Sequence, residues 1–168
     1  MEFAIDRWLH IVSGVLWIGL LYYFNLVQVP GVAAAKADGT AAGISKHIAP
    51  RALLYFRWAA LATWITGAIY LELAHSTPDG RGFMRAFLLQ GSSAYIGIGA
   101  WLGTIMLFNV WGLIWPNQKK VLGFTPATDA EKAKAARTAF LASRTNAMLS
   151  LPMLFFMVVG SPAHNVFK

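Results

Sequence analysis

The sequence contains no cysteine in its 168 residues. This absence excludes disulfide bonds, thiolate metal sites and iron–sulfur clusters, because all of them need cysteine side chains. It also excludes a covalently attached c-type haem, which requires a C-x-x-C-H motif.

Charged residues are scarce as well, at 12% of the chain, whereas a soluble domain carries about 25%. The seven acidic residues form no paired carboxylates with usable spacing, and no Ser-His-Asp set or phosphate-binding loop is recognisable. Hydrophobic residues make up 57% of the chain, and seven tryptophans cluster near the ends of apolar runs. Tryptophan at those places is typical of the interfacial belt of membrane proteins. The composition therefore predicts an integral membrane protein without a soluble active site.

Four apolar runs are long enough to cross a bilayer, which takes about 20 residues. They cover residues 8–29, 52–73, 94–115 and 145–163. Pro30, Pro50 and Pro116 lie at run boundaries, where we expect them to limit the helices because proline cannot continue one. The sequence predicts an all-α fold, a single-domain bundle of four transmembrane helices.

The connections between these runs differ in character. Residues 31–49 are small and suggest a flexible segment with helical turns, and residues 75–92 form a loop that contains Gly and Ser. In the third connection, Thr128 or Asp129 is suited to cap an alanine-rich amphipathic helix over residues 129–143.

Basic residues are distributed unequally between the two ends of the predicted bundle. Ten belong to the first and third connections with their flanks: Lys36, Lys46, Arg51, Arg57, Lys119, Lys120, Lys132, Lys134, Arg137 and Arg144. The other end has Arg7, Arg81, Arg85 and Lys168. Because cytoplasmic loops are enriched in Lys and Arg, this bias predicts both termini on the outer side of a bacterial inner membrane. It also explains the net charge of +7 without nucleic acid as a partner.

The first run has a polar stripe. At 100° per residue, one face collects His10, Ser13, Gly14, Trp17, Leu21, Asn25 and Gln28. Polar groups in a transmembrane helix face the bundle interior or a ligand, so this face should point inward. The opposite face, which includes Val15, Ile18 and Tyr22, is apolar enough to contact lipid.

Three of the four histidines gather at the predicted outer end of the bundle. His10 begins the first run, His75 follows the second and His164 ends the fourth, whereas His47 lies alone at the other end. Imidazole is the usual protein ligand of b-type haem, and helical bundles build haem sites from facing helices. We expect His10 and His164 to be the axial ligands, with His75 as an alternative. Each also has a structural interpretation, as an interfacial or hydrogen-bonded side chain.

Other features complete the candidate site. Gly14 and Trp17 lie beside His10 on the stripe, and Arg57 of the second run could bind a haem propionate or extend to the membrane surface. The third run carries Gly99-x-x-x-Gly103, a face that allows close approach of another backbone or a flat ligand.

The segments WLHIVSGVLWIGLLYYFNLVQVP, APRALLYFRWAALATWITGAIYL, IGIGAWLGTIMLFNVWGLIWPNQKK and ASRTNAMLSLPMLFFMVVGSPAH resemble the membrane domain of bacterial membrane-bound urate hydroxylases, the urate oxidase N-terminal family. Full-length members have a longer membrane region and a C-terminal cytochrome c domain, so the chain resembles a short form. The opening H-x-x-x-G-x-x-W-I-G is similar, more distantly, to copper-resistance D-type proteins and four-helix membrane protoporphyrinogen oxidases. In the latter the first-helix histidine is associated with haem, which implies the same for His10.

The sequence thus favours a membrane electron-transfer subunit that binds haem b, working with other membrane subunits or a cytochrome c. The alternative is a cofactor-free accessory subunit of a larger respiratory or photosynthetic complex. A small enzyme acting on porphyrin or purine is a third interpretation, with few reactive groups to support it.

Overall fold

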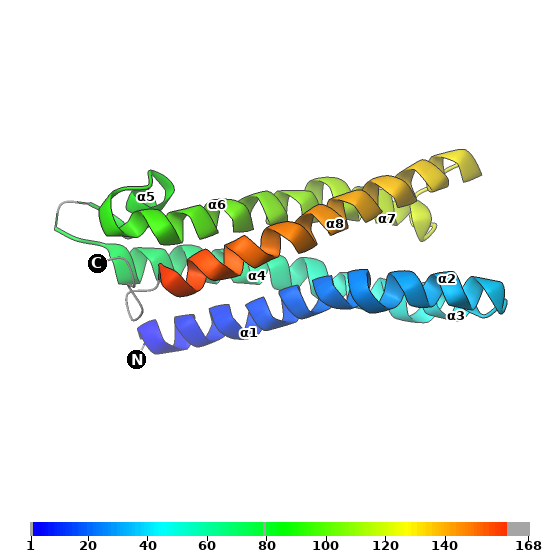
Figure 1. Cartoon of the computed structure of the whole chain (residues 1–168), viewed down its shortest axis with the longest axis horizontal. Coiled ribbons are helices and arrows are strands. Elements are labelled where there is room, and N and C mark those ends of the chain that lie inside the picture. Colours follow the sequence, from blue (N-terminus) through cyan, green and yellow to red (C-terminus); the bar gives the residue numbers. More distant parts are fainter. Residues whose placement is uncertain (1, 79, 161–168) are drawn as a thin grey trace.

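The computed structural model describes residues 2–78 and 80–160, and these form four long antiparallel helices (Figure 1). Several of the helices combine segments of different pitch. The first long helix comprises α1 (Glu2–Tyr22), η1 (Tyr23–Gln28) and α2 (Val29–Ala37). The second comprises α3 (Ala41–Gly43), η2 (Ile44–Ile48) and α4 (Ala49–His75). The third comprises η3 (Gly91–Ser93), α6 (Ala94–Phe108), η4 (Asn109–Ile114) and α7 (Trp115–Val121). The short α5 (Gly82–Phe87) precedes the third long helix, and α8 (Asp129–Val159) is the fourth. The predicted all-α bundle is confirmed.

The long helices extend past the predicted spans at one end of the bundle. Most of residues 31–49, expected to be flexible, is helical, because alanine and other good helix formers continue the helix beyond the apolar run. The reversal is confined to residues 38–40. Gly39 adopts a φ of 72° there, and the Thr40 N–H donates to the Ala35 carbonyl at 2.8 Å. This is the hydrogen bond of a glycine-terminated helix end.

The fourth long helix joins two elements that the sequence suggested separately. The predicted amphipathic helix and the fourth span form the single helix α8, which runs through Pro152 without a break. Its start is the predicted one. Thr128 and Glu131 form a reciprocal capping box, in which each side chain accepts a hydrogen bond from the other residue's backbone N–H.

Three prolines expected to limit helices instead lie within them. Pro30, Pro50 and Pro116 each follow a π-helical segment, and the residue before each proline donates its N–H to a carbonyl five residues back. Proline lacks an N–H and its ring crowds the carbonyl four residues earlier. The wider π-helical turn accommodates this conflict, so the helix continues. We call the end of the bundle that carries these three prolines the proline end.

The helices pack as two antiparallel pairs. α1 lies along α4, and α6 lies along α8, while contacts of α1 with α8 and of α4 with α6 join the pairs (Figure 1). Gly99 permits a close approach in the second pair, since a Cβ added there would lie 3.3 Å from the Met157 backbone nitrogen. The core contains Trp17, Leu21, Phe56 and Met106, each at most 2% exposed.

The outer surfaces of the long helices are strongly apolar. Val15, Phe108 and Met148 are among many large hydrophobic side chains that stay exposed, and all four long helices have the length and composition to cross a membrane. The chain is therefore a multi-pass membrane protein. The first and third connections, with which the ten basic residues are associated, lie at the proline end (Figure 1), and which side of the membrane that end faces stays a prediction.

Candidate functional site

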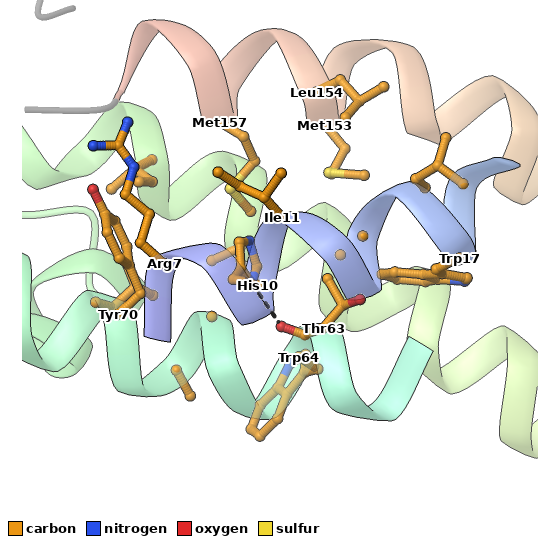
Figure 2. A pocket seen from close by; sticks show the side chains of 18 of the residues that line it. Arg7, His10, Ile11, Trp17, Thr63, Trp64, Tyr70, Met153, Leu154 and Met157 are labelled. Atoms are coloured by element: carbon orange, nitrogen blue, oxygen red, sulfur yellow. Dashed lines mark hydrogen bonds between the residues drawn. The ribbon is translucent and has the colours of Figure 1, made fainter. Parts of the chain in front are cut away.

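A cavity of about 640 Å³ lies between the helices in the half of the bundle away from the proline end (Figure 2). Its volume is within the range of ligand sites, which is about 300–1,000 Å³. Its wall is mostly apolar and comes from α1, α4, α5, α6 and α8. The lining includes Arg7, His10, Gly14, Trp17, Thr63, Trp64, Gly67, Tyr70, Phe83, Phe87, Gly103, Met153 and Met157.

His10 enters this cavity from α1 with a fixed ring orientation. Its Nδ1 lies 2.9 Å from the Thr63 carbonyl on α4, as the dashed line in Figure 2 shows. Because a carbonyl can only accept, this contact assigns the proton to Nδ1 and leaves the Nε2 lone pair for a ligand. A backbone carbonyl that accepts from the other ring nitrogen commonly orients histidines that bind metals.

Glycines on three helices make room in the wall. A Cβ on Gly67 would lie 2.8 Å from His10 Cε1, so only glycine at this position allows the imidazole to lie against α4. In contrast, a Cβ on Gly19 or Gly103 would meet no atom within 4 Å, although both residues line the same cavity. On the Gly99-x-x-x-Gly103 face, Gly99 thus lies against another backbone as expected, and Gly103 lies beside open space.

Aromatic side chains form much of the remaining wall. Trp17 is 2% exposed, and its indole Nε1 has no hydrogen-bond partner. Trp64 donates from Nε1 to Thr104 Oγ1 at 2.9 Å, and Phe83 and Phe87 stack at 4.5 Å between ring centroids. The wall therefore suits a flat apolar ligand, and the Trp17 N–H is a buried donor at its border.

α8 contributes two thioethers on the other side of the cavity. Figure 2 shows Met153 and Met157 extending from α8 toward α1, on the side of His10 away from α4. A methionine sulfur can complete haem coordination opposite a histidine. Neither methionine was identified from the sequence, since nothing in their spacing distinguishes a ligand from a packing residue.

Two charged residues at the start of α1 were also missed. Among the described residues that line the cavity, Arg7 is the one with a formal charge. It lies near Tyr70 in Figure 2. Asp6, one turn before His10, is 8% exposed, and its Oδ2 has no partner. Both occur in the first turns of α1, before the run that we expected to span the membrane.

The cavity does not combine His10 with His75, and the expected pairing of His10 with His164 stays a prediction. His75 does not line the cavity; its Nδ1 lies 3.3 Å from Ser93 Oγ, and its buried Nε2 has no partner. His164 lies outside the described residues. Near His75, Glu72 forms an ion pair with Arg81 at 2.6 Å, which raises the pKa of Arg81 above its ordinary value.

Arg57 lies apart from the cavity as well. Its guanidinium stacks over Trp115 at 3.8 Å from the ring centroid. Trp115 is the first residue of α7, in the half of the bundle toward the proline end. This arrangement matches the interpretation of Arg57 as a residue that extends to the membrane surface. Of the predicted site residues in the described part of the chain, His10, Gly14 and Trp17 share one cavity.

The polar stripe of the first helix points inward as predicted, but the lipid-facing surface is narrower than expected. Trp17, Leu21 and Asn25 are buried, and Val15 is 69% exposed. Ile18, assigned to the lipid face, is 8% exposed, and Tyr22 hydrogen-bonds with Ser150 Oγ. That assignment was wrong because both α4 and α8 contact this helix, so it buries more than one face.

Comparison with known proteins adds the family. A family model described as urate oxidase N-terminal matches residues 80–165. The chain belongs to the urate oxidase N-terminal family. No curated protein and no solved structure matches it. For this member of the urate oxidase N-terminal family, the match covers α5 through α8, whereas His10 and Thr63 lie on helices before the matched residues.

Proposed function

We propose that this protein is a membrane redox subunit that holds one b-type haem in the cavity, with His10 Nε2 as an axial ligand. The family supports a membrane protein associated with redox chemistry. The observation that carries the proposal is the His10 ring, which α4 holds through Thr63 with its free nitrogen unpaired inside a large apolar cavity.

The residues present fit such a group. A flat, mostly apolar macrocycle needs a wide cleft without side chains in its centre, and Gly14, Gly19 and Gly103 provide wall positions without side chains. Among the described residues, no group of three or more His, Asp or Glu side chains gathers to hold a bare metal ion. One imidazole and nearby thioethers instead match the axial ligands of a prosthetic group.

In this proposal, different residues of the cavity wall orient the ligand, bind it and exclude water. Thr63 fixes the tautomer of His10, and the thioether of Met153 or Met157 would hold the group from α8. Arg7 provides positive charge for a propionate at the end of the cavity, a role that the sequence suggested for Arg57. The aromatic and aliphatic wall excludes water, which favours transfer of electrons over reaction with solvent.

When bound, the haem would supply one-electron transfer. We propose that its electrons are exchanged with another membrane subunit or with a cytochrome c, at the inner membrane of a bacterium. Full-length proteins of the resembled type carry a cytochrome c domain, which supports the second partner. Comigration with other subunits or with a cytochrome c on a native gel of solubilised membranes would identify which of them binds.

A haem titration of the detergent-purified protein tests the proposal. The unsubstituted protein should show a saturable shift of the haem absorption band, and His10→Ala should weaken binding strongly. His47→Ala is the matched control, because His47 is exposed and lies at the proline end. Equal binding by the two variants, or no saturable binding at all, would reject the proposal and favour the cofactor-free accessory subunit.

A further inference from the structure

A row of polar side chains lies between α1 and α8 and leads from the cavity toward the proline end. The helix formed by α1 and η1 contributes Tyr22, Asn25 and Gln28, at spacings of three residues. α8 contributes Ser143, Asn146 and Ser150. We call these six residues the α1–α8 polar seam.

Hydrogen bonds join the two sides of the seam. Tyr22 Oη lies 2.9 Å from Ser150 Oγ, and Asn25 Nδ2 donates to Ser143 Oγ at 2.9 Å. Between these pairs, Asn146 is fully buried and binds the third long helix, donating to the Met106 carbonyl at 2.9 Å and accepting from Asn109 Nδ2 at 2.8 Å. The contacts therefore follow the helices for about two turns through the middle of the bundle.

Two buried acceptors of the seam have no donor. Asn25 is 5% exposed, and its Oδ1 has no hydrogen-bond partner, while Gln28 Oε1 is a second buried acceptor without a partner. Such groups are costly away from water unless a donor reaches them. A water molecule can donate two hydrogen bonds, and buried waters in proteins typically bind where several otherwise unpaired polar groups lie close together.

The two ends of the seam lie in different surroundings. Tyr22 lines the cavity that contains His10. At the other end, Gln28 and Ser143 are half-buried, and the next residue after Ser143 is the exposed Arg144. A basic side chain typically marks the level where the bilayer meets water. The seam thus extends from the cavity to the membrane surface at the proline end.

The π-helical segment η1 spans Tyr23–Gln28 and thus includes two of the seam residues. π-helical turns inside α-helices frequently occur at functional sites. Polar residues that face the interior of a membrane bundle commonly mark routes for ions or protons. Both features are concentrated on the part of the first helix that faces α8.

We propose that the α1–α8 polar seam is a hydrated passage that carries water, and protons along it, between the proline end and the cavity. Its ligand is water, held by Asn25 Oδ1, Gln28 Oε1 and the Tyr22–Ser150 pair. This role is independent of which group occupies the cavity. It gives the cavity a route to the aqueous phase at the proline end, separate from the end that carries Arg7.

The natural absence of cysteine makes a direct test available. The single variants Ser143→Cys and Ser150→Cys each replace only the side-chain oxygen by sulfur, so the fold should tolerate them. Each is placed in membrane vesicles of either orientation and treated with a small, charged, membrane-impermeant thiol reagent. Lys36→Cys and Arg81→Cys report which end of the bundle is accessible in each preparation.

Both seam variants should react when the proline end faces the reagent, Ser150→Cys more slowly because it lies deeper. Leu21→Cys is the matched control and should stay unreacted, because Leu21 on α1 is as fully buried as Ser150 on α8 but is not part of the seam. Protection of both seam variants would mean a dry network and would overturn the proposal. Reaction of Ser150→Cys only from the opposite end, or equal reaction of Leu21→Cys, would also overturn it.

Discussion

Gly67→Ala should weaken cofactor binding without unfolding the protein. The added methyl group would lie 2.8 Å from His10 Cε1 and 3.1 Å from His10 Nδ1. Both distances are shorter than ordinary van der Waals contacts, so the imidazole must rotate away from α4. The rotation breaks the hydrogen bond from Nδ1 to the Thr63 carbonyl.

The expected magnitudes separate stability from binding. Loss of one hydrogen bond costs about 0.5–1.5 kcal/mol, and replacing glycine by alanine inside a helix returns roughly 0.5–1 kcal/mol. The net change in the free energy of unfolding should therefore be near zero. Loss of the partner that orients a ligating histidine reduces affinity by about 10–100-fold, which corresponds to roughly 1.4–2.8 kcal/mol of binding free energy.

Haem titration and thermal unfolding of the same preparations measure both quantities. Gly31→Ala is the control, because its methyl group is also added within a helix, meets no atom within 4 Å and lies outside the cavity lining. Gly31→Ala should bind haem about as well as the unsubstituted protein. If Gly67→Ala binds equally well, the position of His10 against α4 does not govern cofactor binding, and the reasoning fails.

Three further substitutions test the fold. Asn146→Ala removes the hydrogen bonds of a fully buried amide and should cost about 0.6–1.7 kcal/mol per bond, measured by denaturant unfolding in mild detergent; an unchanged midpoint would contradict this. Gly97→Ala places a methyl group on the Ala86 carbonyl oxygen, so we expect a large fall in thermal stability, and a stable variant would refute this packing. Thr128→Ala removes the capping box with Glu131 and should cost about 0.5–2 kcal/mol, seen as faster amide exchange in the first turn of α8.

The four-helix architecture was predictable because it depends on patterns that a membrane imposes locally. Long apolar runs must become helices in lipid, where each backbone polar group needs an internal partner. The sequence also contains a signal for the end of the first long helix, since Gly39 follows an alanine-rich segment of good helix formers and terminates it with a positive φ. That signal was not used in the prediction, because the apolar run already ends at Pro30.

The behaviour of the prolines was not predictable from the residues alone. Pro30, Pro50 and Pro116 each lie near the boundary of an apolar run, where the usual rule ends the helix. In the structure the preceding π-helical turn absorbs the steric conflict, as in the Ala49 N–H bond to the Ile44 carbonyl. Whether a helix stops or widens depends on packing against its neighbours, which the local sequence does not contain.

The candidate site was predictable on one helix and obscure on the others. His10, Gly14 and Trp17 share a helical face, so periodicity alone grouped them. Thr63 acts through a backbone carbonyl, and Gly67 acts by lacking a side chain. Neither property has a sequence signal until α1 and α4 are known to be partners.

The absorption spectrum of the protein purified from haem-replete cells tests the central claim most directly. The account predicts a haem band that shifts when the sample is reduced, that is lost or strongly weakened in His10→Ala, and that persists in His47→Ala. A protein that folds in detergent and shows no haem band, or a band that survives His10→Ala unchanged, would contradict it.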